Sequence, residues 1–169
     1  MTANDPVSAF PDLVLPTNDP TDSNEKASQK RTAAFEKMCP RLHGTIVLKI
    51  DPTDDAIRKL LKAQLHQGLL EHRENVRRRG LDCFQDAEQG LHYSLECLTD
   101  MQTAAIGLWA GQPKELTPWL EEFLIVSKEF ERLSRIRVEI GTARPQSLYT
   151  ASRHRLKIEA ELWKAKNAK

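Results

Sequence analysis

A helix–glycine–helix pattern near the carboxyl end limits the folds open to this chain more than any other feature. Between Arg137 and Ala165, one helical repeat of apolar residues stops at Gly141 and a second begins at Pro145. A weaker copy of the pattern surrounds Gly80, 61 residues earlier. Helices favour glycine just past their last residue and proline in their first turn. The sequence therefore predicts a helical hairpin that occurs twice.

Apolar residues at helical spacing predict four long helices. They are expected over about residues 53–79, 82–110, 117–140 and 145–168. Thr53 is expected to cap the first helix, and Thr117-Pro118 to start the third. Because the links are short, neighbouring helices should be antiparallel. We expect an all-α fold of two tandem antiparallel helical hairpins in a coiled-coil-like bundle. A longer coiled coil of the second and third helices that oligomerises is the alternative.

Heptad spacing predicts the buried faces of these helices. Rows of residues seven apart run through the second helix (Phe84, Leu91, Leu98, Ala105 and Ala87, Ser94, Met101, Leu108) and the third (Leu116, Phe123, Phe130 and Trp119, Val126, Leu133, Ile140). The first helix is expected to bury Ile57, Leu61, Leu65, Leu69 and Val76. In the fourth, the stripe of Leu148, Ala151, Ile158, Leu162 and Ala165 is expected to be widened by Leu156 and Trp163. Glu121, Glu122 and Glu129 should be solvated on an outer face.

The first 50 residues differ in composition from the rest. Four prolines stand among Asp, Asn, Thr and Ser in residues 1–30. Such a stretch buries too little apolar surface to offset the entropy of ordering it. We expect a disordered or extended N-terminal tail over residues 1–50, containing at most a short helix at 28–38, and a helical-hairpin domain over residues 51–169.

Composition argues against several classes of function. Of 169 residues, 25 are Lys or Arg and 24 are Asp or Glu, a balance that does not favour nucleic acid as a partner. Three cysteines without a C-x-x-C pair suggest neither a disulfide framework nor a zinc site. The amino terminus has neither the basic nor the apolar region of a secretory signal, and no apolar stretch approaches the length of a membrane span. The sequence predicts a cytoplasmic protein.

Catalytic and cofactor motifs are not found in the sequence. It contains no G-x-G-x-x-G, P-loop or G-x-S-x-G pattern, and its histidines have no H-x-x-x-H spacing. We expect no enzyme activity, no cofactor, no metal and no small-molecule substrate. Arg77, Arg78 and Arg79 could bind phosphate, but positive charge at a helix C-terminus is also what the helix dipole favours.

The turns resemble the helical-hairpin repeat of outer-membrane efflux proteins of the TolC type. At the second turn the resemblance is carried by Arg137, Gly141, Leu148, Ala151, Leu156, Glu161 and Leu162, and at the first by Arg77, Gly80, Phe84, Ala87 and Leu95. Gly90 stands where the repeat has alanine, and the strands of the family's barrel are missing. The resemblance implies hairpin tips that contact an adaptor protein, and a periplasmic location.

The sequence thus predicts a non-catalytic structural or interaction module. It would bind a protein partner, or itself, through helix packing. The expected partner-binding residues are those at the two turns: Arg77, Arg78, Arg79, Gly80, Asp82, Phe84, Gly141, Thr142, Arg144, Pro145 and Gln146. A small nucleic-acid-associated helical protein that uses the turn arginines is the alternative.

Overall fold

Helices make up the regular structure of the part of the chain that the computed structural model describes, residues 30, 33–44, 48–79 and 87–168. In chain order they are α2 (Pro40–His43), α3 (Ala56–Arg79), α4 (Ala87–Leu108), α5 (Pro113–Glu139) and α6 (Pro145–Asn167). Residues 33–38 are also helical, and none of the described residues lies in a strand. The all-α prediction is confirmed.

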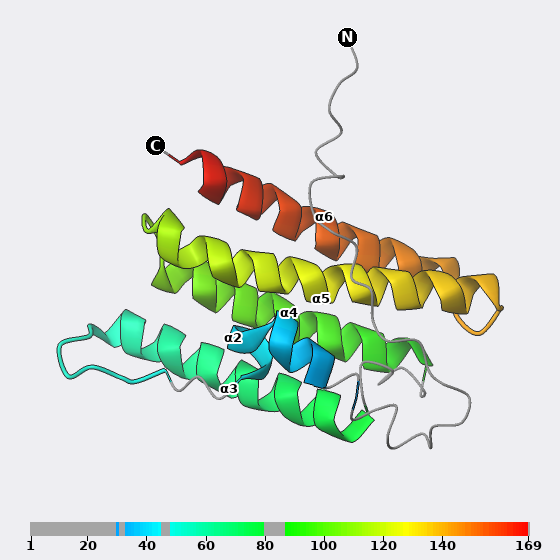
Figure 1. Ribbon diagram of the computed structural model, residues 1–169, viewed down its shortest axis with the longest axis horizontal. Helices are drawn as coiled ribbons and strands as arrows, with labels where there is room; N and C mark the ends of the chain where they lie inside the picture. The colour runs from blue at the N-terminus through cyan, green and yellow to red at the C-terminus, as the bar shows by residue number, and fades with distance from the viewer. Residues whose placement is uncertain (1–29, 31–32, 45–47, 80–86, 169) are drawn as a thin grey trace, which may run out of the picture.

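The long helices lie side by side in chain order, from α3 at one edge to α6 at the other (Figure 1). The most extensive packing is between α3 and α4 and between α5 and α6, and α4 contacts both α5 and α6 more sparsely. The short helix α2, blue in Figure 1, contacts α3 and α5. Helix α6 therefore packs mainly on α5 and also contacts α4.

The core is made by the inward faces of all these helices. Its largest fully buried side chains are Phe35, Leu42, Leu65, Leu69, Leu98, Met101, Leu120, Phe123, Leu124, Phe130, Ile158 and Leu162. Close packing of α3 on α4 depends on Gly68, where an added Cβ would clash with Met101 Cγ. The indole rings of Trp109 and Trp119 stack with centroids 5.0 Å apart, where α4 leads into α5.

Two helix starts differ from the prediction. Asp55, rather than Thr53, caps α3, because its Oδ1 accepts a hydrogen bond from the Arg58 N–H at 2.7 Å. Helix α5 begins at Pro113, so the expected start at Thr117-Pro118 lies inside it. Proline suits the first helical position, because the N–H that it lacks would have no intrahelical partner there.

Helix α2 is held at both ends by charged side chains of the long helices. On α5, Glu122 Oε2 accepts hydrogen bonds from the backbone N–H groups of Arg41 at 2.8 Å and Leu42 at 3.0 Å. The Arg41 guanidinium donates to Glu122 Oε1 at 3.0 Å. From α3, Arg73 donates to the carbonyls of Leu42 at 3.0 Å and Arg41 at 3.2 Å. These bonds satisfy backbone groups that a short helix cannot pair internally.

Two sequence predictions are therefore wrong. The extended tail was expected to reach residue 50 with a short helix at 28–38. Residues 33–38 are helical as expected, but residues 40–43 are helical too, and Phe35, Cys39 and Leu42 are fully buried in the core. The helical domain thus includes this segment, while the tail predicted for residues 1–29 lies outside the described residues. Glu122 and Glu129 were expected in solvent, and both are buried.

Candidate functional site

The turn between α5 and α6 is exposed, and backbone hydrogen bonds tie it to the last turn of α5. Gly141 has a φ of 75° and lies just past the end of α5. Its N–H donates to the Val138 carbonyl at 3.1 Å, and the Thr142 N–H donates to the Arg137 carbonyl at 2.8 Å. This pair of bonds is a Schellman motif, which needs a left-handed residue at the glycine position. The predicted end of the helix at Gly141 is confirmed.

Replacing Gly141 by alanine is expected to lower the free energy of unfolding by about 1 kcal/mol. The left-handed conformation costs an alanine about 1–2 kcal/mol, and the stiffer unfolded chain offsets part of this. No atom lies within 4 Å of the added methyl group, so a steric clash adds nothing. Urea unfolding measures the change, with the exposed Gln146→Ala as a control expected to stay within about 0.5 kcal/mol. Equal values for the two variants would contradict the prediction.

The predicted partner-binding residues are only partly within the described chain. Thr142, Arg144, Pro145 and Gln146 are exposed beside Gly141. The other turn is described only up to Arg77–Arg79, which form the last turn of α3. Gly80, Asp82 and Phe84 lie outside the described residues. The end of α3 and the α5–α6 turn lie toward the same end of the molecule in Figure 1.

A row of large apolar side chains faces away from the core on α6. Tyr149, Leu156 and Trp163 are 68%, 52% and 65% exposed. They lie seven residues apart, so they share one side of the helix. We call this row the α6 outer face. The prediction that Leu156 and Trp163 widen the buried stripe is wrong, because Ile158 and Leu162 fill the contact with α5 and α4 from the opposite side of α6.

The two edges of the α6 outer face differ in charge. One edge carries the exposed side chains of Arg153, Lys157 and Lys164, which we call the cationic edge. Lys164 pairs with Glu161 at 2.7 Å, whereas Arg153 and Lys157 form no ion pair with any described residue.

On the opposite edge, the charges balance one another. Ser152 Oγ donates to Glu131 at 2.6 Å, and Arg155 binds both Glu131 at 2.5 Å and Glu159 at 2.7 Å. Lys166 pairs with Glu121 of α5 at 2.8 Å. Positive charge without a partner is therefore concentrated on one side of the apolar row.

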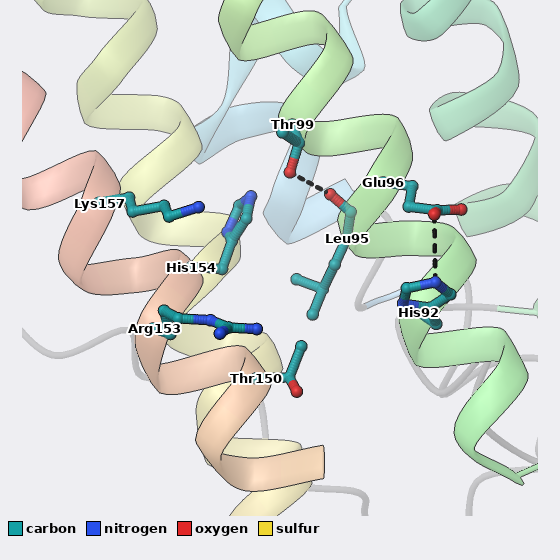
Figure 2. A pocket seen from close by; sticks show the side chains of 8 residues that line it. All are labelled: His92, Leu95, Glu96, Thr99, Thr150, Arg153, His154 and Lys157. Carbon is teal, nitrogen blue, oxygen red and sulfur yellow. Dashed lines mark hydrogen bonds and ion pairs between the residues drawn. The ribbon is translucent and has the colours of Figure 1, made fainter. Parts of the chain in front are cut away.

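A cleft of about 130 Å³ opens between α4 and α6 (Figure 2). We call it the α4–α6 cleft, and its lining residues are His92, Leu95, Glu96, Thr99, Thr150, Arg153, His154 and Lys157. Figure 2 shows Arg153 and Lys157 extending from α6 toward α4 on either side of His154. On α4, the Glu96 carboxylate pairs with His92 at 3.1 Å. The cleft is therefore lined both by Arg153 and Lys157 of the cationic edge and by His154.

His154 is the buried polar group of this cleft, with only 7% of its surface exposed. Its Nδ1 lies 3.0 Å from Ser127 Oγ on α5, and its Nε2 is buried without a hydrogen-bond partner. Burial and then the charge of Lys157 lower the pKa of His154 from 6.5 to about 4. The imidazole is therefore neutral at pH 7.

The two described cysteines are buried free thiols. Burial raises the pKa of Cys39 far above its usual range and that of Cys97 to about 12. Neither thiol is thus poised as a nucleophile near neutral pH. Within the described ranges, no three His, Cys, Asp or Glu side chains are grouped so that they could hold a metal ion.

Comparison of the chain with protein-family models, curated proteins and solved structures found no match. The resemblance to the TolC-type hairpin repeat thus stays a prediction. Among the described helices, none combines the length and hydropathy needed to cross a bilayer.

Proposed function

We propose that this chain is a non-catalytic interaction module that binds an amphipathic, acidic helix of a partner protein along the α6 outer face. Its scaffold is a pair of tandem helical hairpins, α3–α4 and α5–α6, with α2 placed against α3 and α5. The observation that carries the proposal is the exposed row Tyr149, Leu156 and Trp163 on the side of α6 that faces away from the core.

The spacing of this row favours a helical partner. Apolar residues repeated every seven positions form the seam along which a second helix packs. Two of the three residues are aromatic, and Trp and Tyr are enriched among the side chains that contribute most of the binding free energy at interfaces. A long α-helix that presents one such row matches the helix-in-groove mode of recognition, in which anchors recur at helical spacing.

The charge beside the row favours an acidic partner. Arg153 and Lys157 border the α6 outer face without ion-pair partners among the described residues. A partner helix with glutamates along its flank would supply the missing carboxylates, whereas these cations would repel a basic helix. The opposite edge is already neutralised by Glu131 and Glu159, so it adds no competing attraction.

Binding of a designed peptide tests the proposal. The probe is a synthetic helix of about three heptads with leucine at the a and d positions and glutamate at e and g. We expect it to bind the full chain and to shift the emission of the exposed Trp163. Trp163→Ala or Leu156→Ala should weaken binding about tenfold, or about 1.4 kcal/mol, measured by calorimetry. The matched control is Leu60→Ala, which removes a 70% exposed leucine of α3 and should leave affinity unchanged.

Three outcomes would contradict the proposal. One is equal binding of the same peptide with lysine in place of glutamate, and another is equal weakening by Leu60→Ala and Leu156→Ala. The third is preferential binding of duplex DNA or of anionic vesicles in place of the peptide. DNA binding that weakens steeply with added salt would support the nucleic-acid alternative instead. Light scattering at several concentrations would show whether a second copy of the chain occupies the face.

A further inference from the structure

We propose that a second copy of this chain binds along the outward side of α3, in an antiparallel order that places Leu60 of each copy opposite Leu70 of the other. This surface belongs to a different helix from the α6 outer face, and a different observation carries it. That observation is a stretch of α3, residues 56–70, in which every exposed side chain is uncharged.

Charged side chains of α3 do not lie where a surface helix ordinarily has them, on the side that faces solvent. Between residues 56 and 70 the exposed side chains are alanine, glutamine, leucine and isoleucine only. Leu60 and Leu70 are 70% and 47% exposed. The charged residues of this stretch are half-buried: Arg58, Lys59 and Lys62. Because depletion of charge is typical of the centre of a protein interface, this side of α3 is suited to cover by another chain.

The loop that precedes α3 binds these cations. The Asp54 carboxylate pairs with Arg58 at 3.1 Å and with Lys62 at 2.5 Å. The Lys59 ammonium donates to the Pro52 carbonyl at 3.4 Å. These contacts hold the cations beside the loop, so the exposed side of the helix is left uncharged.

The exposed residues have the spacing of a coiled-coil seam. Alternate steps of four and three residues separate the members of the row, which we call the α3 outer face: Ala56, Leu60, Ala63, Gln67 and Leu70. The buried side of the same helix carries Leu65 and Leu69. Helix α3 thus has two seams, and the chain itself fills one of them.

The order of residues along the α3 outer face is complementary to its own reverse. In an antiparallel pair with the two-fold axis level with Leu65, Leu60 lies opposite Leu70 of the second copy. Ala63 lies opposite Gln67 in the same pair, so a small side chain meets a large one. A two-fold interface uses the same surface on both copies, so each contact occurs twice.

Charges at the two ends of the α3 outer face favour this antiparallel order. Lys59 lies near its start, and Glu71 and Glu74 lie just past its end. Antiparallel pairing brings Lys59 of one copy within about one helical turn of the two glutamates of the other, whereas parallel pairing places like charges together. An acidic or a basic partner helix would meet both signs of charge. A second copy therefore fits this face better than either.

The length of the face sets the expected strength of the dimer. Residues 56–70 span about 22 Å at about 1.5 Å per residue. A contact of one such helix with its copy is smaller than a standard protein interface. We therefore expect a weak, reversible dimer with a dissociation constant on the order of 100 µM.

Sedimentation equilibrium of the full chain between about 10 µM and about 1 mM tests this proposal. We expect a monomer–dimer equilibrium. Leu60→Ala should raise the dissociation constant of the dimer at least about tenfold, because the symmetric interface loses the contact twice. Leu156→Ala is the matched control, since it removes a 52% exposed leucine of α6 and should leave dimerisation unchanged.

A charge swap tests the order of the two helices. Leu60→Lys alone should abolish dimerisation, because it places an ammonium group against an apolar side chain. Adding Leu70→Glu should restore the dimer, since only antiparallel pairing places the introduced ammonium opposite the introduced carboxylate. Both positions are exposed, so the variants should fold, and urea unfolding checks that they do.

Three results would overturn the proposal. The full chain may stay monomeric up to about 1 mM, Leu156→Ala may weaken the dimer as much as Leu60→Ala, or Leu70→Glu may fail to rescue Leu60→Lys. Binding of the glutamate-bearing peptide at the α6 outer face is a separate measurement, so either proposal can fail while the other stands.

Discussion

Alanine at position 122 is expected to lower the free energy of unfolding by about 3 kcal/mol, the largest effect of a single substitution that we predict. The Glu122 carboxylate accepts hydrogen bonds from the N–H groups of Arg41 and Leu42 and from the Arg41 guanidinium. Its removal leaves the buried N–H of Leu42 and the partly buried N–H of Arg41 unpaired, and an unpaired buried group costs about 1–3 kcal/mol. Urea unfolding of the full chain measures the loss.

Position 121 provides a matched control for this experiment. Glu121 belongs to the same helix, but it is exposed and pairs with Lys166 at the surface. Exposed ion pairs contribute about 0–1 kcal/mol, so Glu121→Ala should change stability little. Glu122→Gln keeps one oxygen acceptor and should lose less than Glu122→Ala. Equal losses for Glu121→Ala and Glu122→Ala would show that the buried carboxylate does not hold α2 in place.

Stability is expected to fall steeply as the pH drops from about 6.5 toward 4, because three histidines are buried in the neutral form. Burial, followed by the charge of Arg73, lowers the pKa of His43 to about 4. Burial, then His43 and Arg73, lowers the pKa of His72 to about 3, and His154 titrates at about 4. The imidazole rings of His43 and His72 lie 4.9 Å apart beside α2, so protonating one disfavours protonating the other.

The sign of the effect follows from proton uptake. Below pH 6.5 the unfolded chain protonates these histidines while the folded chain does not, so protons favour the unfolded state. Each histidine contributes about 1.4 kcal/mol per pH unit, and three together give up to about 4 kcal/mol per unit. Glu122 offsets part of this near pH 4.5, because burial raises the pKa of its carboxyl and the folded state then binds that proton first.

Urea unfolding at a series of pH values measures this slope. His72→Leu should reduce it by about 1.4 kcal/mol per pH unit, because it removes one of the three protons. Leu60→Ala is the control, since it removes an exposed leucine of α3 that binds no proton, so the slope should stay unchanged. A stability that stays constant between pH 6.5 and 4 would contradict the burial of these rings as neutral groups.

Periodicity predicted the helices well because long apolar repeats report directly on helix faces. Leu65, Leu98, Met101, Phe123 and Ile158 all belong to the predicted rows and all are buried. The prediction is wrong for Ile57 and Ile140, which are 70% and 65% exposed. Helix ends were predicted where local chemistry decides them, as at Gly141. The ends were predicted wrongly where two nearby residues could each begin the helix, as with Asp55 and Thr53 or Pro113 and Pro118.

The candidate sites depended on tertiary pairing that no local pattern reports. Helix α6 carries two apolar rows, one through Ile158 and one through Leu156, and only its packing on α5 and α4 decides which of them is buried. Glu122 could not be told from Glu121 by spacing, since its partners on α2 lie about 80 residues away in sequence. His154 had a signal that could have been used, because it falls between Ala151 and Ile158 on the buried side.

Mapping the contact surface of the glutamate-bearing peptide on the full chain tests the central claim most directly. Backbone amide resonances are followed during a titration with that peptide. The claim predicts that the largest shifts cluster around Tyr149, Leu156 and Trp163. Shifts confined to the turn at Gly141–Gln146, or absent from α6 altogether, would contradict it.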